Sequence, residues 1–311
     1  MSAKGLSLMS GGLDSQLAVR ILERAGAEVE AVCFNTPFFD ITGAEKAAKA
    51  LGVKLHLLDF LEEEIELIET HAHGFGGAMN PCIDCHARMI ERAGELMTRL
   101  GYDFVATGEV QGQRPMSQNR QSMGIVEKCS KMKGRLVRPL SAKLLEPTLP
   151  ELEGKLDREK LYDISGRGRE RQIALAAEFG LTDYPAPAGG CKLTEAGFCR
   201  KLKDLQEHEG LRLADGTVNR AMITLLKVGR RFRFPRGTSV VLGRDARENS
   251  LLRKLDFGEV ILPETGVIGP TALVPRVVEV EELESVRRLV AAYVKGTTEK
   301  DRLPFKPYQI C

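Results

Sequence analysis

Residues 6–19, LSLMSGGLDSQLAV, join a short apolar run, a turn rich in glycine and serine, and the start of an amphipathic helix. The run LSLM is typical of a buried strand, and apolar residues recur with helical spacing from Leu17 to Leu22. Gly11 and Gly12 permit backbone angles and close approaches that side chains would forbid. A strand, loop and helix in this order direct several backbone N–H groups and the positive end of a helix dipole at one point. We therefore expect this loop to bind an anion.

The composition of the 311-residue chain is that of a globular protein, with 43% hydrophobic residues, 28% charged residues and a net charge of +2. Its longest apolar runs are shorter than a membrane span, and its first residues lack the apolar core of a signal peptide. We expect a cytoplasmic protein that does not bind membranes. Its seven cysteines favour thiols or metal ligands over a disulfide framework.

Strands and helices alternate through the first third of the chain. Strands are predicted over residues 28–35, 53–60 and 102–109, and helices over residues 44–51, 62–71 and 82–100. This alternation predicts an α/β fold with a parallel sheet covered by helices. Ligands of such sheets bind beyond the carboxyl ends of the strands, where the SGGLDS loop and the ATGE segment both lie.

The later part of the chain follows a different pattern. Helices are predicted over residues 119–132, 168–179 and 194–207. Beyond them, alternation around Phe232 and Phe234 indicates a smaller α+β unit. We place the boundary near residues 205–215, which divides the chain into a domain of residues 1–210 and a domain of residues 211–311.

The SGGLDS sequence in this context resembles the signature of the PP-loop ATP pyrophosphatases, which have the adenine nucleotide alpha hydrolase-like fold and cleave ATP between its α and β phosphates. The GxxxxGK[ST] pattern of kinases and GTPases is missing from this loop. The resemblance implies ATP and Mg²⁺ as cofactors, with Asp14 as a catalytic acid that helps to hold the metal. The residues implied in nucleotide binding are Ser10, Gly11, Gly12, Asp14 and Ser15. The alternative is an ordinary glycine-rich turn.

Two thiols lie three residues apart in NPCIDCH, residues 80–86, at the start of a predicted amphipathic helix. One helical turn separates Cys82 from Cys85, so both sulfur atoms can face one point, and a helix N-terminus favours thiolates. Cys191 is a third candidate because prolines and glycines place it in a loop. Cys33 is expected to be an inert thiol inside a strand. Cys129 and Cys199 rank lower as ligands because each lies in a predicted helix without a second thiol one turn away.

The cysteine positions also resemble those of the PP-loop tRNA thiolation enzymes, some of which hold a [4Fe-4S] cluster with a CxxC pair and one distant cysteine. This resemblance implies Cys82, Cys85 and Cys191 as catalytic residues and cluster ligands, with one iron left open for sulfide. A catalytic disulfide or persulfide pair is an alternative. Zinc is another, with His86 as the nearest fourth ligand, although His86 is expected on the helix surface.

The segment ATGEVQGQR, residues 106–114, follows a predicted strand and resembles the second nucleotide segment of these thiolases. Gly108 and Arg114 are candidates for nucleotide binding, and Gln118 is a further polar residue of the same loop. The common motif there is ATGH, and Glu109 stands in place of the histidine. Arg114 in a polar loop is alternatively a solvated side chain.

Basic residues are concentrated in two segments. The first comprises Lys128, Lys131, Lys133, Arg135, Arg138 and Lys143, and the second comprises Lys227, Arg230, Arg231, Arg233, Arg236, Arg244, Arg247, Arg253 and Lys254. The second segment contains few acids and two interleaved phenylalanines, which suits a phosphate backbone. Residues 215–275 also resemble the RNA-binding module of the NFACT proteins. The alternative is a solvated charged surface.

Together these features predict an ATP-dependent tRNA thiolase that adenylates a base carbonyl oxygen and replaces it with sulfur. The expected partners are tRNA and a sulfur donor, which is either a protein or free sulfide. Two alternatives are open. One is a PP-loop enzyme that inserts sulfur into a small molecule, and the other is an RNA-binding protein whose nucleotide site is a non-catalytic relic.

Overall fold

The computed structural model describes residues 2–186, 190–275 and 279–311. The chain divides into two compact units between Thr194 and Glu195. Unit 1 is an α/β domain and unit 2 is a smaller α+β domain, so the predicted fold class is confirmed.

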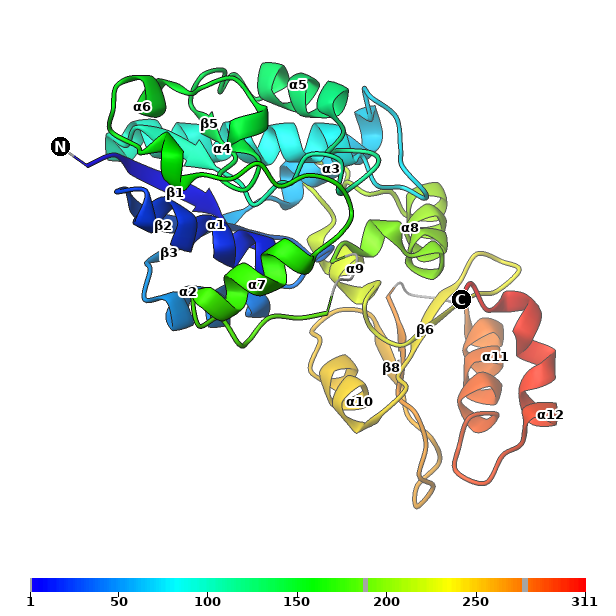
Figure 1. Cartoon of the computed structure of the whole chain (residues 1–311). Coiled ribbons are helices and arrows are strands. Elements are labelled where there is room, and N and C mark those ends of the chain that lie inside the picture. The colour runs from blue at the N-terminus through cyan, green and yellow to red at the C-terminus, as the bar shows by residue number, and fades with distance from the viewer. Residues whose placement is uncertain (1, 187–189, 276–278) are drawn as a thin grey trace. The chain divides into compact units, whose positions relative to one another are not determined.

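Unit 1 is built on a five-stranded parallel sheet with the strand order β3-β2-β1-β4-β5 (Figure 1). The strands are β1 (Lys4–Leu8), β2 (Glu28–Asn35), β3 (Leu55–Asp59), β4 (Phe104–Ala106) and β5 (Leu136–Val137). Four of them lie where the sequence predicts strands. The fifth, β5, is only two residues long and leaves no periodic signal in the sequence.

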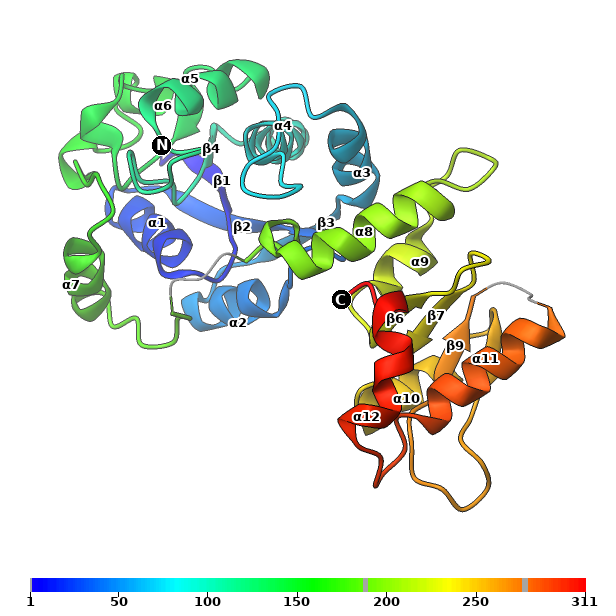
Figure 2. The same ribbon diagram turned by 90° about the vertical axis from the view of Figure 1, so that its right-hand side faces the viewer.

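Helices cover both faces of this sheet, as parallel strands require. They are α1 (Leu13–Arg24), α2 (Thr42–Leu51), α3 (Leu61–Thr70), α4 (Cys82–Leu100), α5 (Arg120–Cys129), α6 (Leu149–Leu152) and α7 (Glu170–Glu178). Figure 2 shows α1, α2 and α7 on one side of the sheet and α3, α4 and α5 on the other.

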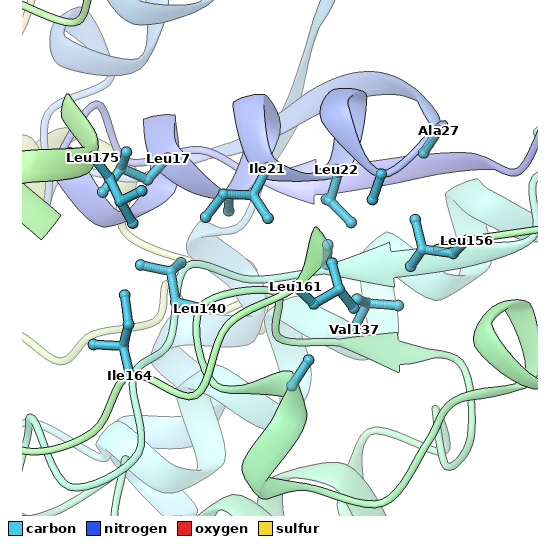
Figure 3. Close-up of a cluster of buried hydrophobic side chains, with 14 of the residues drawn as sticks. Leu17, Ile21, Leu22, Ala27, Val137, Leu140, Leu156, Leu161, Ile164 and Leu175 are labelled. Atoms are coloured by element: carbon cyan, nitrogen blue, oxygen red, sulfur yellow. The ribbon is translucent and has the colours of Figure 1, made fainter. Parts of the chain in front are cut away.

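A hydrophobic core holds α1 in place behind the loop that precedes it. Leu17, Ile21 and Leu22 of α1 are fully buried, and Figure 3 shows how they face apolar side chains from later parts of unit 1. These partners are Val137, Leu140, Leu156, Leu161, Ile164 and Leu175. Burying one such side chain contributes about 1.5–3 kcal/mol. The start of α1 is therefore fixed against the sheet.

The two loops that the sequence singles out leave the sheet at the same edge. Strands β1 and β4 are parallel neighbours, with Ser7 opposite Ala106. The SGGLDS loop follows β1 and the ATGE segment runs out of β4. The strand order also reverses at this point, because β2 and β4 lie on opposite sides of β1. Such a switch point is where open parallel sheets bind ligands.

Unit 2 contains a four-stranded antiparallel sheet with the order β6-β7-β9-β8. Its strands are β6 (Arg230–Arg233), β7 (Ser239–Leu242), β8 (Glu259–Ile261) and β9 (Ala272–Val274). Its helices are α8 (Ala196–His208), α9 (Arg220–Leu225), α10 (Ala246–Arg253), α11 (Val280–Ala291) and α12 (Glu299–Arg302). Phe232 and Phe234 pack in its core with Val286 and Leu289 of α11.

Helix α8 belongs to unit 2, whereas the sequence-based division after residue 210 places it in the first domain. Its polar side chains explain this difference. Lys201 donates hydrogen bonds to the carbonyls of Leu226 and Gly229, at 3.3 and 3.2 Å, and Asp204 contacts Arg231. These bonds join α8 to segments that follow it in the chain, and hydrophobic periodicity does not reveal them.

Candidate active site

The SGGLDS loop needs glycine for steric reasons. Gly11 has a φ of +83°, and a Cβ there would lie 2.3 Å from the carbonyl carbon of Gly43. Gly12 is the N-cap of α1, and its carbonyl accepts hydrogen bonds from the Ser15 hydroxyl at 2.8 Å and the Gln16 amide at 3.2 Å. The N–H groups of the first helical turn have no carbonyl partner within the helix. They are the donors that a bound anion would use.

Asp14 lies in the first turn of α1 with one carboxylate oxygen unsatisfied. Its Oδ2 accepts a hydrogen bond of 3.0 Å from Gln113 Nε2, whereas its Oδ1 is buried and has no hydrogen-bond partner among the residues that the structure describes. Burial raises the pKa of Asp14, and the Gln113 hydrogen bond and the charges of Arg169 and Arg114 oppose this shift. A buried carboxylate oxygen without a partner is a suitable ligand for Mg²⁺.

The ATGE segment packs directly on the start of α1. A Cβ at Gly108 would lie 2.6 Å from the carbonyl carbon of Asp14, so only glycine permits this approach. Arg114, which is exposed, follows in the same loop and interacts electrostatically with Asp14. Gln118 is buried, and its Oε1 has no hydrogen-bond partner. The tertiary structure thus brings the two predicted nucleotide segments into contact.

Arg169 is a site residue that the sequence interpretation missed. It precedes α7, and its charge acts on Asp14. Its Nε is buried and has no hydrogen-bond partner within the described part of the chain. The preceding loop is fixed by a hydrogen bond of 2.8 Å from the Gly166 amide to the Gln111 carbonyl. Arginine recurs in this part of the sequence, so no local signal separates Arg169 from Arg167 or Arg171.

Glu109, which replaces the expected histidine, is buried among polar partners. Arg138 Nε and the Thr107 hydroxyl donate to its Oε2, at 2.9 and 3.0 Å, and His86 Nδ1 lies 3.1 Å from its Oε1. Burial raises the pKa of Glu109, but the charge of Arg138 and the hydrogen bond from His86 lower it to about 2. Glu109 is therefore ionised. Arg138, assigned above to a basic segment, is buried in this ion pair and does not face solvent.

The two cysteines of NPCIDCH lie in the first turn of α4, as predicted, but their surroundings differ. The Sγ of Cys82 accepts a hydrogen bond of 3.0 Å from Asn80 Nδ2, and Cys82 is partly exposed. Cys85 is buried, and its Sγ lies 3.6 Å from Glu64 Oε2. Burial raises the pKa of Cys85 well above its usual value, and the charges of Glu64, Cys191 and Cys82 add to this shift.

Cys191 therefore lies within electrostatic reach of Cys85 although the sequence separates them widely. Residues 187–189 of its proline and glycine loop lie outside the described residues. Glu64 of α3, which the sequence interpretation missed, is 1% exposed, and burial raises its pKa to about 7 despite a hydrogen bond from Cys85. Over the described parts of the chain, no three His, Cys, Asp or Glu side chains form a group that could hold a metal ion.

The remaining cysteines occupy different environments. Cys33 is buried in β2, and burial raises the pKa of its thiol to about 11. Cys199 is buried in α8, and Cys129 is exposed at the end of α5. The expectation that Cys33 is an inert strand thiol agrees with this burial.

Only some of the basic side chains in residues 227–254 of unit 2 are exposed to solvent. Arg231 is 1% exposed, and its guanidinium contacts Asp204 at 3.0 Å and Glu209 at 2.5 Å. Arg233 contacts the same two acids, at 2.6 and 2.7 Å. Both acids precede the segment, in or directly after α8. The predicted run of phosphate-binding arginines is therefore wrong at these two positions, because acids from elsewhere in the chain neutralise them.

Other cations of this segment are exposed. Arg236 pairs with Glu279 and Glu281 at the surface, and Arg244 pairs with Glu248. Arg247 lies in α10 and Lys254 directly follows this helix, and both side chains are exposed.

The length and the composition of the helices show whether any of them could cross a membrane. No described helix combines the length and the apolar character that crossing a membrane requires.

Two family models match the chain. Residues 4–135 match the tRNA methyl transferase HUP domain, and residues 229–303 match the NFACT protein RNA binding domain. The first match covers most of unit 1 and the second lies within unit 2. Both agree with the resemblances found in the sequence, and the second begins and ends later than the predicted 215–275.

Curated relatives carry one description. The chain is 37% identical over 122 residues to the tRNA-specific 2-thiouridylase MnmA of Sulfurimonas denitrificans, a match that covers 35% of each chain. It is 27% identical over 229 residues to the MnmA of Marinobacter nauticus, covering 68% of this chain and 56% of that one. The chain therefore spans between about a third and somewhat more than half of the length of these relatives.

Among solved structures, a 4-thiouridine synthetase–RNA complex with bound ATP matches with a TM-score of 0.38 and 19% identity. This match covers 58% of this chain and 54% of that one.

Proposed function

We propose that the chain is an ATP-dependent tRNA thiolase. Its residues 4–135 match the tRNA methyl transferase HUP domain, its residues 229–303 match the NFACT protein RNA binding domain, and the curated relatives reported above are tRNA-specific 2-thiouridylases. A carbonyl oxygen of a tRNA base attacks the α-phosphorus of ATP, and pyrophosphate leaves. Sulfide then attacks the adenylated carbon, the C–O bond breaks, and AMP departs with the base oxygen. The carbon keeps the sulfur, a proton is released, and no oxidant or reductant is consumed because the sulfur enters as sulfide.

The observation that carries this proposal is the state of Asp14. Its buried Oδ1 has no partner, at the N-terminus of α1, while two arginines act on the same carboxyl. An unsatisfied acid among cations and helix N–H groups suits a magnesium-bound polyphosphate. In this proposal Asp14 holds Mg²⁺, and the loop amides together with Arg114 and Arg169 hold the phosphates. Charge on the departing pyrophosphate is stabilised by groups that are already in position.

We propose that Cys82, Cys85 and Cys191 bind and deliver the sulfur that enters the tRNA base. Their thiols are the donor type that iron–sulfur clusters use, and the charge of Cys191 contributes to the raised pKa of Cys85. The described residues do not present these three thiols as a group that could hold a metal ion. A [4Fe-4S] cluster would therefore need the thiols to move closer together, and three cysteine ligands would leave one iron open to sulfide. The alternative is persulfide or disulfide chemistry at Cys82 and Cys85. An iron assay distinguishes this alternative from a cluster.

Unit 2 is proposed to bind the tRNA. The NFACT-type match supports this role, and the exposed cations Arg247 and Lys254 are suited to phosphate contacts. Arg231 and Arg233 have a structural role in this proposal.

The test is pyrophosphate release with ATP and bulk tRNA from cells lacking the gene, combined with mass spectrometry of the tRNA nucleosides. We expect release that depends on tRNA and a thionucleoside that is missing from the deletion strain. Release that depends on a small molecule would point to a small-molecule sulfur insertase. Nucleotide binding without turnover would point to a relic site.

The cluster is tested on its own by iron analysis of anaerobically purified protein. We expect a brown protein with about four irons per chain, as a cubane cluster requires. The variant Cys191→Ala should lose this iron, and Cys199→Ala should keep it. Colourless protein without iron would contradict the cluster and would favour persulfide or disulfide chemistry at Cys82 and Cys85.

A further inference from the structure

Glu109 connects two parts of unit 1 that are separate in the sequence. Its own segment follows β4, and its Oε1 meets His86 of α4, whose Nδ1 lies 3.1 Å away. Both the segment and the helix contain a neighbouring residue that belongs to the proposed site. Gly108, one residue before Glu109, packs on the backbone of Asp14, and Cys85 immediately precedes His86. A short series of contacts thus runs from the nucleotide loop to the thiols.

The two oxygens of Glu109 have different partners. Oε2 receives hydrogen bonds from Arg138 and from Thr107, so the charge of the buried carboxylate is compensated there. Oε1 contacts His86, which also helps to lower the pKa of the carboxyl. The His86 side chain is 28% exposed, whereas that of Glu109 is only 6% exposed. The contact therefore joins the buried, hydrogen-bonded Glu109 to a partly exposed side chain of α4, the helix that carries Cys82 and Cys85.

We infer that Glu109 and His86 are a positioning pair that holds the thiol-bearing start of α4 in register with the nucleotide loop. This inference rests on the proposed thiolase function. Adenylation occurs at one end of the pair and sulfur delivery at the other, and an adenylated base must meet sulfur before water reaches it. Misplacing reacting groups by about 1 Å can cost about a hundredfold in rate. The pair acts on the efficiency of sulfur transfer and leaves adenylation itself unaffected.

The test measures the thionucleoside formed per pyrophosphate released, with ATP, sulfide and bulk tRNA from cells lacking the gene, under anaerobic conditions. In His86→Ala we expect this ratio to fall about tenfold, while the rate of pyrophosphate release and the KM for ATP change less than about twofold. His86→Asn places an amide N–H near the position of Nδ1 and should restore most of the ratio.

The matched control is His56→Ala. His56 lies 2.5 Å from Glu30, on two strands away from the site, so its loss removes a similar histidine–carboxylate contact. We expect this variant to keep the wild-type ratio. If His86→Ala fails to fold, as circular dichroism would show, His86→Ser serves for the same comparison.

Two outcomes would overturn the inference. One is an unchanged ratio in His86→Ala, whether or not both rates fall together. The other is a ratio in His86→Asn as low as that in His86→Ala, since a hydrogen bond to Glu109 would then not matter. Failure of the proposed function would differ from both, because the wild-type protein would release no pyrophosphate in response to tRNA.

Discussion

The SGGLDS loop and the basic strand β6 both suggest phosphate binding in the sequence, but only the loop has a structure that is compatible with that role. In the loop, neighbouring residues form the proposed anion site together, since glycines, helix N–H groups and Asp14 lie within six positions. In β6, Arg231 and Arg233 are neutralised by Asp204 and Glu209. A motif that contains its own geometry can be interpreted locally, whereas the meaning of a charge depends on partners that the fold supplies.

The largest expected effect tests the local side of this comparison. Asp14→Ala should lower tRNA-dependent pyrophosphate release by about a thousandfold, because a preorganised charge at the reacting phosphates is lost. Release is measured with a coupled pyrophosphate assay, and circular dichroism verifies the fold. Turnover close to that of the wild type would refute the assignment of the loop.

The second effect tests whether β6 is structural. Arg231→Ala removes one partner of a buried ion-pair network and should lower the free energy of unfolding by about 3 kcal/mol. Urea denaturation followed by circular dichroism measures this. If the variant were as stable as the wild type but bound RNA much more weakly, Arg231 would be assigned to RNA binding and not to a structural role.

The third effect concerns the exposed cations. Replacing Arg247 and Lys254 with alanine should weaken tRNA binding, and the slope of log K against log salt should fall by about 0.7–0.9 for each phosphate contact that is lost. Filter binding over a salt series gives both quantities. The thermal midpoint should stay the same, and a salt slope identical to that of the wild type would exclude these residues from the RNA interface.

The smallest effect completes the comparison within the same segment. Among the described residues, Arg236 forms ion pairs at the surface, with Glu279 at 2.9 Å and Glu281 at 3.0 Å. Arg236→Ala should therefore change the free energy of unfolding by no more than about 0.5 kcal/mol. A loss as large as that of Arg231→Ala would mean that burial does not distinguish these two arginines.

Sequence patterns with a short period predict most of the fold of unit 1. The β1–loop–α1 unit, the strands β2 to β4 and the helix that carries the cysteine pair all follow from hydrophobic periodicity and from glycines at turns. Strand β5 has too few residues for such a pattern, and α8 shows its attachment to unit 2 only through Lys201 and Asp204. These features depend on contacts between distant residues.

The sequence by itself determined the glycine-rich loop between β1 and α1, the alternation of strands and helices that predicts a parallel sheet, and the CxxC pair at a helix start. Each of these is visible as a short pattern of neighbouring residues. Only the tertiary structure decided that the charge of Arg169 acts on Asp14, that the charge of Cys191 acts on Cys85 and that Glu109 pairs with His86 and Arg138. It also decided which arginines of unit 2 are buried. The physical reason is that electrostatic interactions depend on distance in space and on burial, and neither quantity is encoded by spacing along the chain.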